Sequence, residues 1–467
     1  MNAPFRSYLL SRPAAQVAFC VMLLLQGLAA FSAFAQGDNW TTPMATKLGV
    51  RLEAQLDSGG EDAWDPKQHP LVFITTEGPG YGGLLSGVKL PGLAIFDAEA
   101  RKVVAHRNYD VLKMGFQNVF EPHGLGVSPD GKWIYLATGE GSFGTLNKGA
   151  WLIINARTLK VDKMLRLQGN AHHASAFKDE SGRERVLAYG WNQPPFVLDP
   201  KNDNRVVGGI TYADMKGQGY LYFVDPEGKY MYASGRIEPP EARDKAHENV
   251  LIKVSTKDWK LRKRIPVEDG DPVWISFTAD NKTAYISGAH TNRVFRYDTV
   301  KDAVTGKIRA GVEGPYGVHL GWDDKELYTI GKGEGSHNRG KVLGYVQPAL
   351  IGKTIQASDQ FATNCVRGDH GTLHPNPDAN EMWITCNSSF EIVVFDLDQK
   401  KVTERIPMPN GGSTHSGAFV QYDGWSGRVL SDHNGLHGPA LELKRKLLSK
   451  TSTAGQAASA AGKDGRM

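Results

Sequence analysis

Short runs of alternating apolar and polar residues, each bounded by turn residues, follow one another along most of the chain. The clearest example covers residues 121–139, where an apolar run at 124–128 leads through a Pro-Asp-Gly turn into a second run at 133–137. Alternation on both sides of such a turn predicts a β-hairpin. Helical periodicity is nearly absent, which argues against repeats built of stacked helices.

The same hairpin outline recurs with different side chains, and the starts lie 43 to 55 residues apart. The units begin at residues 121, 170, 217, 269, 313, 368 and 411. Most hairpins are followed by two more strand-like runs, as at 150–155 and 160–167. Four short antiparallel strands in a repeat of about fifty residues are typical of propeller blades. The chain is therefore predicted to be all-β, a seven-bladed β-propeller with four-stranded blades.

The two ends of the repeat region predict how the ring closes. Strand-like runs at 71–76, 92–97 and 102–106 precede the first complete unit, and the last unit supplies an inner strand near 418–421. Together they would complete one blade from both chain ends, leaving no open sheet edge. We expect a single propeller domain over residues 36–443. Residues 444–467, rich in Ala, Ser, Gly and Lys, are predicted to be a disordered tail.

The first 35 residues have the pattern of an export signal. Arg6 and Arg12 precede an apolar stretch at 17–30, and the small-x-small motif Ala33-Phe34-Ala35 follows it. We expect cleavage after Ala35 and a mature periplasmic protein without a membrane partner. An uncleaved membrane anchor is the alternative.

Composition and short motifs exclude several function classes. The net charge of the 467 residues is only +4, which gives no electrostatic support for a nucleic-acid partner. The sequence has no Cys-x-x-Cys-His motif for covalent haem, no phosphate-binding loop and no His-Glu-x-x-His zinc helix. Cys20 lies within the expected signal, so Cys365 and Cys386 remain. A disulfide between them is expected in an oxidising compartment, and a thiolate metal ligand is the rival interpretation.

Histidines recur where the inner strands are expected to begin, at the mouth of the central channel. Four of the seven units carry one at this level, namely His123, His173, His370 and His415. Other candidates on the same face are Asp271, His290, His337, His433 and His437. The residues flanking these histidines differ, which argues against one repeated turn-bracing role. Convergent imidazoles with a carboxylate suit zinc or copper, and the Irving–Williams order favours copper.

With this arrangement the chain resembles the copper-dependent propeller enzymes of the thiocyanate dehydrogenase family. The resemblance spans residues 50–440 and rests on the order of Lys89, His123, His172-His173, Glu238-Pro-Pro-Glu241, Asp271, His337, His370, His415 and His437. It implies a trinuclear-type copper centre with a ligand set drawn from His172, His173, Asp271, His337, His370 and His437. It implies a catalytic set of Lys89, His123, Glu238 and His415. The choices between His172 and His173, His433 and His437, and Glu238 and Glu241 stay open.

The resemblance also implies an activity, which is oxidation of thiocyanate with water to cyanate and sulfur. The substrate would be a small anion whose charge Lys89 offsets, and the electrons would pass to an external acceptor such as a periplasmic cytochrome c. Alternatives are a copper propeller of the methanethiol oxidase or nitrous oxide reductase type, or an exported binding protein without catalysis. The oligomeric state, including a homodimer, stays open.

Overall fold

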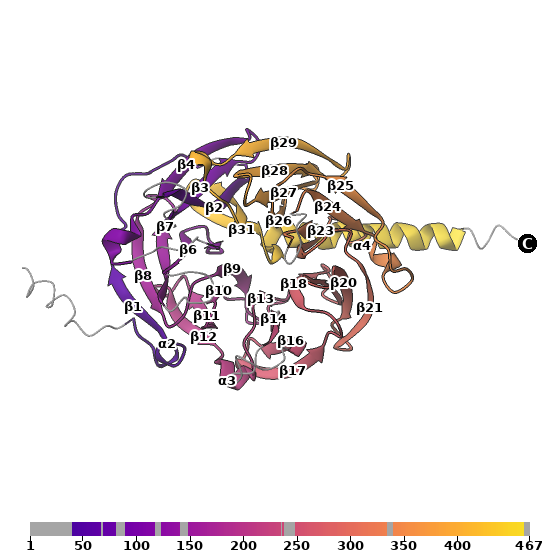
Figure 1. Cartoon of the computed structure of the whole chain (residues 1–467), viewed down its shortest axis with the longest axis horizontal. Helices are drawn as coiled ribbons and strands as arrows, with labels where there is room; N and C mark the ends of the chain where they lie inside the picture. The colour runs from indigo at the N-terminus through magenta and orange to yellow at the C-terminus, as the bar shows by residue number, and fades with distance from the viewer. Residues whose placement is uncertain are drawn as a thin grey trace, which may run out of the picture.

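The computed structural model describes residues 40–66, 69–80, 89–116, 123–140, 148–234, 236–237, 248–333 and 340–461. Seven antiparallel sheets form a ring around a central channel (Figure 1). The seven-bladed β-propeller predicted from the repeats is confirmed. The proposed export signal at 1–35 lies outside the described residues.

Six blades follow the chain, and their strands run in sequence order from the channel outwards. Blade 1 contains β5 (Leu125–Val127), β6 (Trp133–Glu140), β7 (Lys148–Asn155) and β8 (Val161–Leu167), with β1 (Val50–Gln55) outside β8. Blade 2 contains β9 (His173–Lys178), β10 (Glu184–Gly190), β11 (Gln193–Asp199) and β12 (Arg205–Gly209). Blade 3 contains β13 (Leu221–Val224), β14 (Tyr230–Ser234), β16 (Glu248–Ser255) and β17 (Lys260–Pro266), and β15 (Arg236–Ile237) pairs with β16.

The next three blades repeat this plan. Blade 4 contains β18 (Pro272–Phe277), β19 (Thr283–Gly288), β20 (Arg293–Asp298) and β21 (Ala303–Arg309). Blade 5 contains β22 (Pro315–Leu320), β23 (Leu327–Gly331), β24 (Val342–Val346) and β25 (Asp359–Ala362). Blade 6 contains β26 (Gly368–Leu373), β27 (Glu381–Cys386), β28 (Glu391–Asp396) and β29 (Lys401–Pro407). Short helical elements are α2 (Pro43–Lys47), α3 (Tyr212–Met215), η1 (Val111–Met114), η2 (Pro348–Leu350) and η3 (Pro409–Gly411).

The closing blade joins the two ends of the propeller. It contains β2 (Leu71–Gly80), β3 (Lys89–Asp97), β4 (Lys102–Asn108) and, from the other end, β30 (Gly417–Asp423). β30 pairs antiparallel with β2, with Leu71 opposite Val420 and Ile74 opposite Gly417. The predicted closure from both chain ends is therefore confirmed, and pairing of the last inner strand removes an exposed sheet edge.

A hairpin beyond the closing blade was not expected. β31 (Ser426–Asp432) pairs with the free side of β30, and β32 (Gly435–Leu436) pairs with β31. This places β31 inside the ring, where the Asp432 carboxylate accepts a hydrogen bond from the backbone N–H of Ala176 in β9 (3.2 Å). The β31–β32 hairpin, which we call the plug, thus occupies part of the channel.

The plug continues into α4 (Gly438–Ala461), so the segment expected to be a tail begins within a helix. The Lys444 ammonium is buried, donates to the Gly321 carbonyl (2.7 Å) and pairs with Asp324 (2.6 Å). Arg445 Nε donates to the Ala279 carbonyl (2.9 Å). These contacts hold the first turns of α4 on blades 4 and 5, and a composition of Ala, Leu and Lys favours helix once anchored. Figure 1 shows α4 extending past the rim of the ring.

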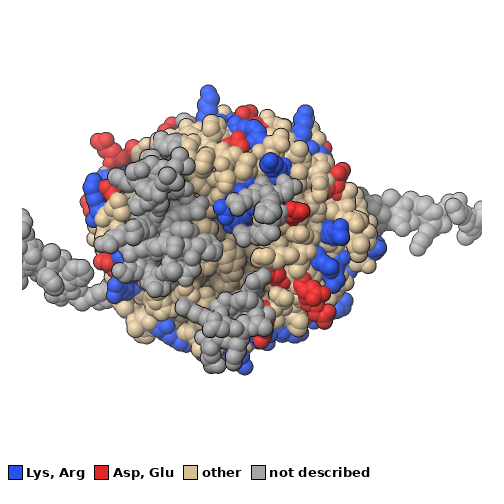
Figure 2. Space-filling view, viewed as in Figure 1, with Lys and Arg blue, Asp and Glu red and all other residues tan. Residues whose placement is uncertain are grey.

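No helix within the described ranges is both long and apolar enough to cross a membrane. Over the described part of the face in Figure 2, basic and acidic side chains are interspersed around the rim.

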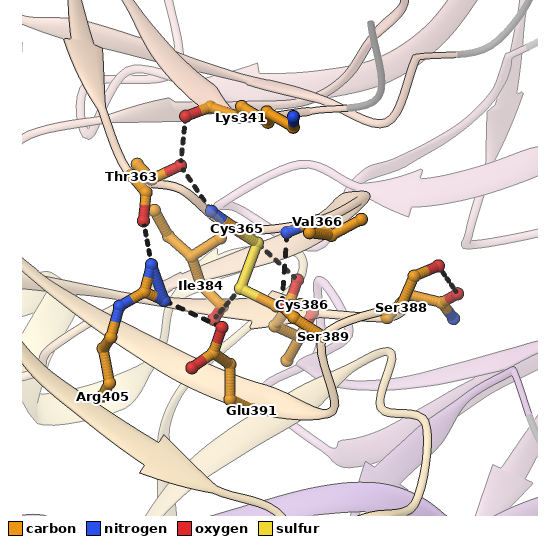
Figure 3. Close-up of a disulfide and its surroundings, with 12 residues drawn as sticks. Lys341, Thr363, Cys365, Val366, Ile384, Cys386, Ser388, Ser389, Glu391 and Arg405 are labelled. Carbon is orange, nitrogen blue, oxygen red and sulfur yellow. Dashed lines mark hydrogen bonds and ion pairs between the residues drawn. A yellow bond between two sulfur atoms is a disulfide. The ribbon is translucent and has the colours of Figure 1, made fainter. Parts of the chain in front are cut away.

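The expected disulfide between Cys365 and Cys386 is present, with a Cα–Cα distance of 5.3 Å. It ties the loop after β25 to the end of β27 (Figure 3). Arg405 braces the same loop, because its guanidinium donates to the Thr363 carbonyl (2.6 Å) and pairs with Glu391 (2.8 Å). Both sulfur atoms are therefore engaged with each other, which excludes the thiolate ligand considered above.

Candidate functional site

Six histidines meet inside the channel, near the ends at which the inner strands begin. His123 precedes β5, His172 and His173 lead into β9, His370 lies in β26, His415 precedes β30, and His433 lies at the tip of the plug. We call these six residues the histidine cluster. Neighbouring ring centroids are 4.1 Å apart for His172–His173, 4.3 Å for His123–His415, 4.8 Å for His173–His370, and 5.2 Å for His123–His172 and His173–His433.

The cluster is withdrawn from solvent, and every one of its six residues is at most 4% exposed. Both ring nitrogens of His172, His173 and His433 have no hydrogen-bond partner among the residues that the structure describes. The same holds for Nε2 of His370, whose Nδ1 lies 3.4 Å from the Asp369 carboxylate. Leaving a buried polar group unsatisfied costs about 1–3 kcal/mol, and native proteins contain few such groups. Their concentration in one space is typical of a site that receives a ligand.

The buried rings are held in the neutral form. Burial, reinforced by neighbouring histidines, puts the pKa values of His172 and His173 well below the ordinary histidine value. Burial likewise lowers the pKa of His433 to about 4. The pKa of His370 is also lowered by burial, although the Asp369 carboxylate opposes this effect. Neutral imidazole is the form that ligates a metal ion, so no proton has to leave these rings first.

A buried ion pair borders the cluster. Asp369 Oδ1 lies 3.0 Å from Lys332 Nζ, and Asp369 Oδ2 contacts Nδ1 of His415. The same oxygen lies 3.4 Å from Nδ1 of His370. Burial alone would raise the pKa of Asp369, but Lys332, His370 and His415 outweigh it and hold the pKa well below its usual range. The carboxylate is therefore ionised, with its charge balanced by the lysine.

Aromatic side chains surround the rings. Trp191 and Tyr220 lie beside His172, at centroid distances of 4.2 and 5.3 Å. Trp274 and Tyr316 lie beside His370, at 5.1 and 5.4 Å. Such a wall excludes water and strengthens electrostatic interactions inside it.

Bulges in three inner strands bring neighbouring residues into the channel mouth. In β26 the pairing with β27 slips between Gly368 and Gly371, across Asp369 and His370. Similar shifts occur in β18 across Trp274 and in β22 across Tyr316. Side chains in a regular strand alternate between faces, and a bulge re-aims one of them. This explains how adjacent residues such as Asp369 and His370 contact the same site.

Close approach of blades 1 and 2 also fixes the cluster. A Cβ added to Gly124 would lie 1.8 Å from the carbonyl oxygen of His172, so only glycine permits this contact. In blade 6, the backbone N–H of His370 donates to the Thr385 hydroxyl (3.1 Å), which donates back to the His370 carbonyl (3.3 Å). The backbones that carry these rings are therefore tightly held.

The structure separates the two histidines of the plug. His433 reaches the cluster, whereas His437 lies beside a cavity of about 620 Å³ at the opposite end of the channel, among the turns that follow β5, β9 and β13. There His437 Nε2 lies 2.7 Å from Asp432 Oδ1. The two histidines are separated because β31 lies inside the ring and is not the second strand of a blade, so the turn after it spans the channel.

The other predicted site residues are distributed as follows. Asp271 contacts Nδ1 of His290 and accepts a hydrogen bond from the His290 backbone N–H (3.2 Å) in blade 4. Glu238, Glu241 and His337 lie outside the described residues. Lys89 begins β3, and its side chain also lies outside the described part.

Sequence reasoning did not identify Asp369, Lys332 or His319 as members of this region. Burial, with His370 and His433 nearby, lowers the pKa of His319 to about 3. Asp369 stands directly before His370, and Lys332 follows β23, five positions before His337 in the sequence. Nearness in sequence to His370 and His337 was therefore the only signal by which the Lys332–Asp369 ion pair could have been predicted.

The donor set fits copper in its chemistry, since clustered neutral imidazoles are good ligands for that metal. Within the described ranges, no three His, Cys, Asp or Glu side chains are already arranged as a metal-binding group. The fit therefore rests on the donor type and on the buried nitrogens without partners.

No protein-family model matches the chain, and no curated protein matches it. Solved structures share its fold. The dihydro-heme d1 dehydrogenase NirN, in complex with DHE, is 16% identical, with a TM-score of 0.50 over 88% of this chain and 83% of that one. The periplasmic gluconolactonase PpgL of Pseudomonas aeruginosa is 15% identical, with a TM-score of 0.51 over 74% of this chain and 99% of that one. At these identities the likeness extends to the propeller fold alone.

Proposed function

We propose that this chain is an exported, copper-dependent oxidoreductase that oxidises thiocyanate with water to cyanate and sulfur. The observation that carries the proposal is the group of buried imidazoles at His172, His173, His370 and His433, each of which has at least one ring nitrogen without a hydrogen-bond partner in the described part of the chain. The resemblance of the sequence to the thiocyanate dehydrogenase family supplies the substrate. The disulfide supports an oxidising compartment, where such bonds persist.

These four imidazoles would hold the copper, and the number of donors favours more than one ion. When bound, copper supplies Lewis-acid and electron-accepting chemistry. Asp271 and His337 stay in the proposal as further ligands drawn from the family resemblance. His437 is left out, because it lies at the opposite end of the channel. The aromatic wall would keep bulk water away from the reacting atoms.

The reaction balances as thiocyanate plus water giving cyanate, sulfur, two protons and two electrons. A carbon–oxygen bond forms, the carbon–sulfur bond breaks, and the electrons pass to an external acceptor such as a periplasmic cytochrome c. His415 would accept a proton from the attacking water at Nε2, because the Asp369 carboxylate beside Nδ1 would stabilise the resulting imidazolium. His123 stacks on His415 and would position it. Lys89 and Glu238 are proposed for charge balance and proton transfer.

The test is metal analysis of protein produced with copper, combined with thiocyanate-dependent reduction of an artificial electron acceptor. We expect two or more copper ions per chain and turnover with thiocyanate. His69→Ala is a suitable control, because His69 pairs with Asp97 (3.2 Å) at the end of β3, and its copper content should match the parent.

Two outcomes would overturn the proposal. Protein without copper would indicate a non-catalytic propeller. Copper-loaded protein that turns over methanethiol or nitrous oxide, but not thiocyanate, would retain the metal site and refute the substrate.

A further inference from the structure

A single carboxylate lies between two histidines to which the proposed function gives different tasks. Asp369 is fully buried in β26, and its Oδ2 contacts Nδ1 of His415 and lies 3.4 Å from Nδ1 of His370. His370 is a proposed metal ligand, whereas His415 is proposed for proton transfer. The carboxylate therefore connects the two halves of the site.

Lys332 determines how this carboxylate can be used. Its ammonium lies 3.0 Å from Asp369 Oδ1 and 4.1 Å from the centroid of the Tyr316 ring, and the residue is only 3% exposed. A buried carboxylate requires such compensation, because an unpaired charge in the interior is strongly destabilising. With Lys332 beside Oδ1, Oδ2 is the oxygen directed at the imidazoles.

The contact of His415 with Asp369 defines one tautomer. An ionised carboxylate only accepts hydrogen bonds, so the contact with Asp369 requires a proton on Nδ1 of His415. The amide Nδ2 of Asn387 lies 2.8 Å from Nε2 and 3.4 Å from Nδ1 of the same ring, so it contacts the ring without favouring either tautomer. The Asp369 contact therefore indicates a ring that is protonated at Nδ1, which leaves Nε2 as the nitrogen that can accept a proton. Partners of this kind fix the orientation of a histidine and its basicity.

We propose that Asp369, anchored by Lys332, is a positioning residue that fixes His415 with its proton on Nδ1 and couples it to His370. The coupling to copper rests on the proposed function, whereas the tautomer does not. Loss of the carboxylate would release His415 from this orientation and would weaken metal binding through His370.

The first measurement uses the copper-free full-length protein labelled with ¹⁵N-histidine, so it does not depend on any activity. Long-range ¹H–¹⁵N correlation spectra report which ring nitrogen carries the proton, and His415→Gln assigns the signals of His415. We expect protonated Nδ1 in the parent and in Asp369→Glu, which keeps a carboxylate. Asp369→Asn should shift the proton to Nε2 or produce a mixture of tautomers.

A matched control is Asp97→Asn, which changes a similar contact between a carboxylate and the Nδ1 of His69. It should leave the His415 signals unchanged. An unprotonated Nδ1 of His415 in the parent overturns the proposal even if no Asp369 variant folds. Unchanged His415 signals in a folded Asp369→Asn protein overturn it as well.

The second measurement is copper affinity, by competition with a chelator of known affinity. Partners of ligating histidines typically contribute about 10- to 100-fold to metal affinity, and a loss of that size is expected for Asp369→Asn. Asp369→Glu should lose less, and Asp97→Asn should lose nothing. If the tautomer result holds but the parent binds no copper, the proposed function fails and the positioning role stands. If the parent binds copper and Asp369→Asn binds it equally well, the coupling to His370 fails.

Discussion

Removal of the Cys365–Cys386 disulfide should cost a large part of the stability of the protein. The bridge spans 21 positions in the sequence, and the loop entropy of a cross-link of that size corresponds to about 3 kcal/mol at 25 °C. Cys386 also adjoins Thr385 and Asn387, which hydrogen-bond His370 and His415. We therefore expect the double variant Cys365→Ala/Cys386→Ala to unfold at lower denaturant and to bind copper less tightly.

The assay is equilibrium unfolding in urea at 25 °C, because in a domain of this size ~3 kcal/mol shifts the Tm by only a few degrees. Both cysteines are buried, so the alanine substitutions also remove packed sulfur atoms. Reduction of the parent separates the two effects, since it breaks the cross-link and leaves the sulfur atoms in place. The double variant itself should not respond to reductant. A parent whose unfolding curve is the same with and without reductant would refute the reasoning.

Three further predictions follow from the site. His370→Ala should lower the copper content per chain, which metal analysis measures. His415→Ala and Lys89→Ala should keep most of the copper and lose turnover in the acceptor-reduction assay. The loss should be about 10²–10⁴-fold where general acid–base assistance is removed. Gly124→Ala should destabilise the fold by ~1–3 kcal/mol in thermal or urea unfolding, because its Cβ would overlap the His172 carbonyl. Gly182→Ala is a comparison without overlap, because no atom lies within 4 Å of the added Cβ. It should show only the cost of an alanine at a φ of +77°. The copper-free protein should lose stability as the pH falls from about 6.5 towards 4, because the folded pKa of His433 is about 4 and the unfolded chain binds more protons in that range. In His433→Gln the slope of unfolding free energy against pH should be shallower. An unchanged slope would contradict the assignment.

The ring of blades could be predicted from sequence because its signals are local. Each hairpin carries its own turn and its own alternation, and seven copies reinforce one another. Alignment of those hairpins also predicted that four histidines lie at the start of inner strands, at the channel mouth. The structure brings these four residues together, namely His123, His173, His370 and His415.

The plug and α4 could not be predicted in the same way. β31 has the alternation of an ordinary blade strand, and only its pairing partner decides whether it lies inside the ring. The start of α4 is ordered by contacts of Lys444 and Arg445 with residues more than a hundred positions earlier in the chain. Asp369 was missed because neighbours on a regular strand face opposite sides, and the bulge that cancels this alternation leaves no clear mark in the sequence.

Pairing of β30 with β2 also determines the stage of folding at which the histidine cluster can be complete. The strands that pair there lie near opposite ends of the propeller, so their contact has a very high sequence separation and forms slowly. His415 and His433 belong to the last segments to be synthesised, while His123 and His173 belong to the first blades. A nascent or truncated chain could therefore build several blades and still hold only part of the histidine cluster. High-affinity metal binding should appear with the final folding step, which makes it a reporter of complete closure.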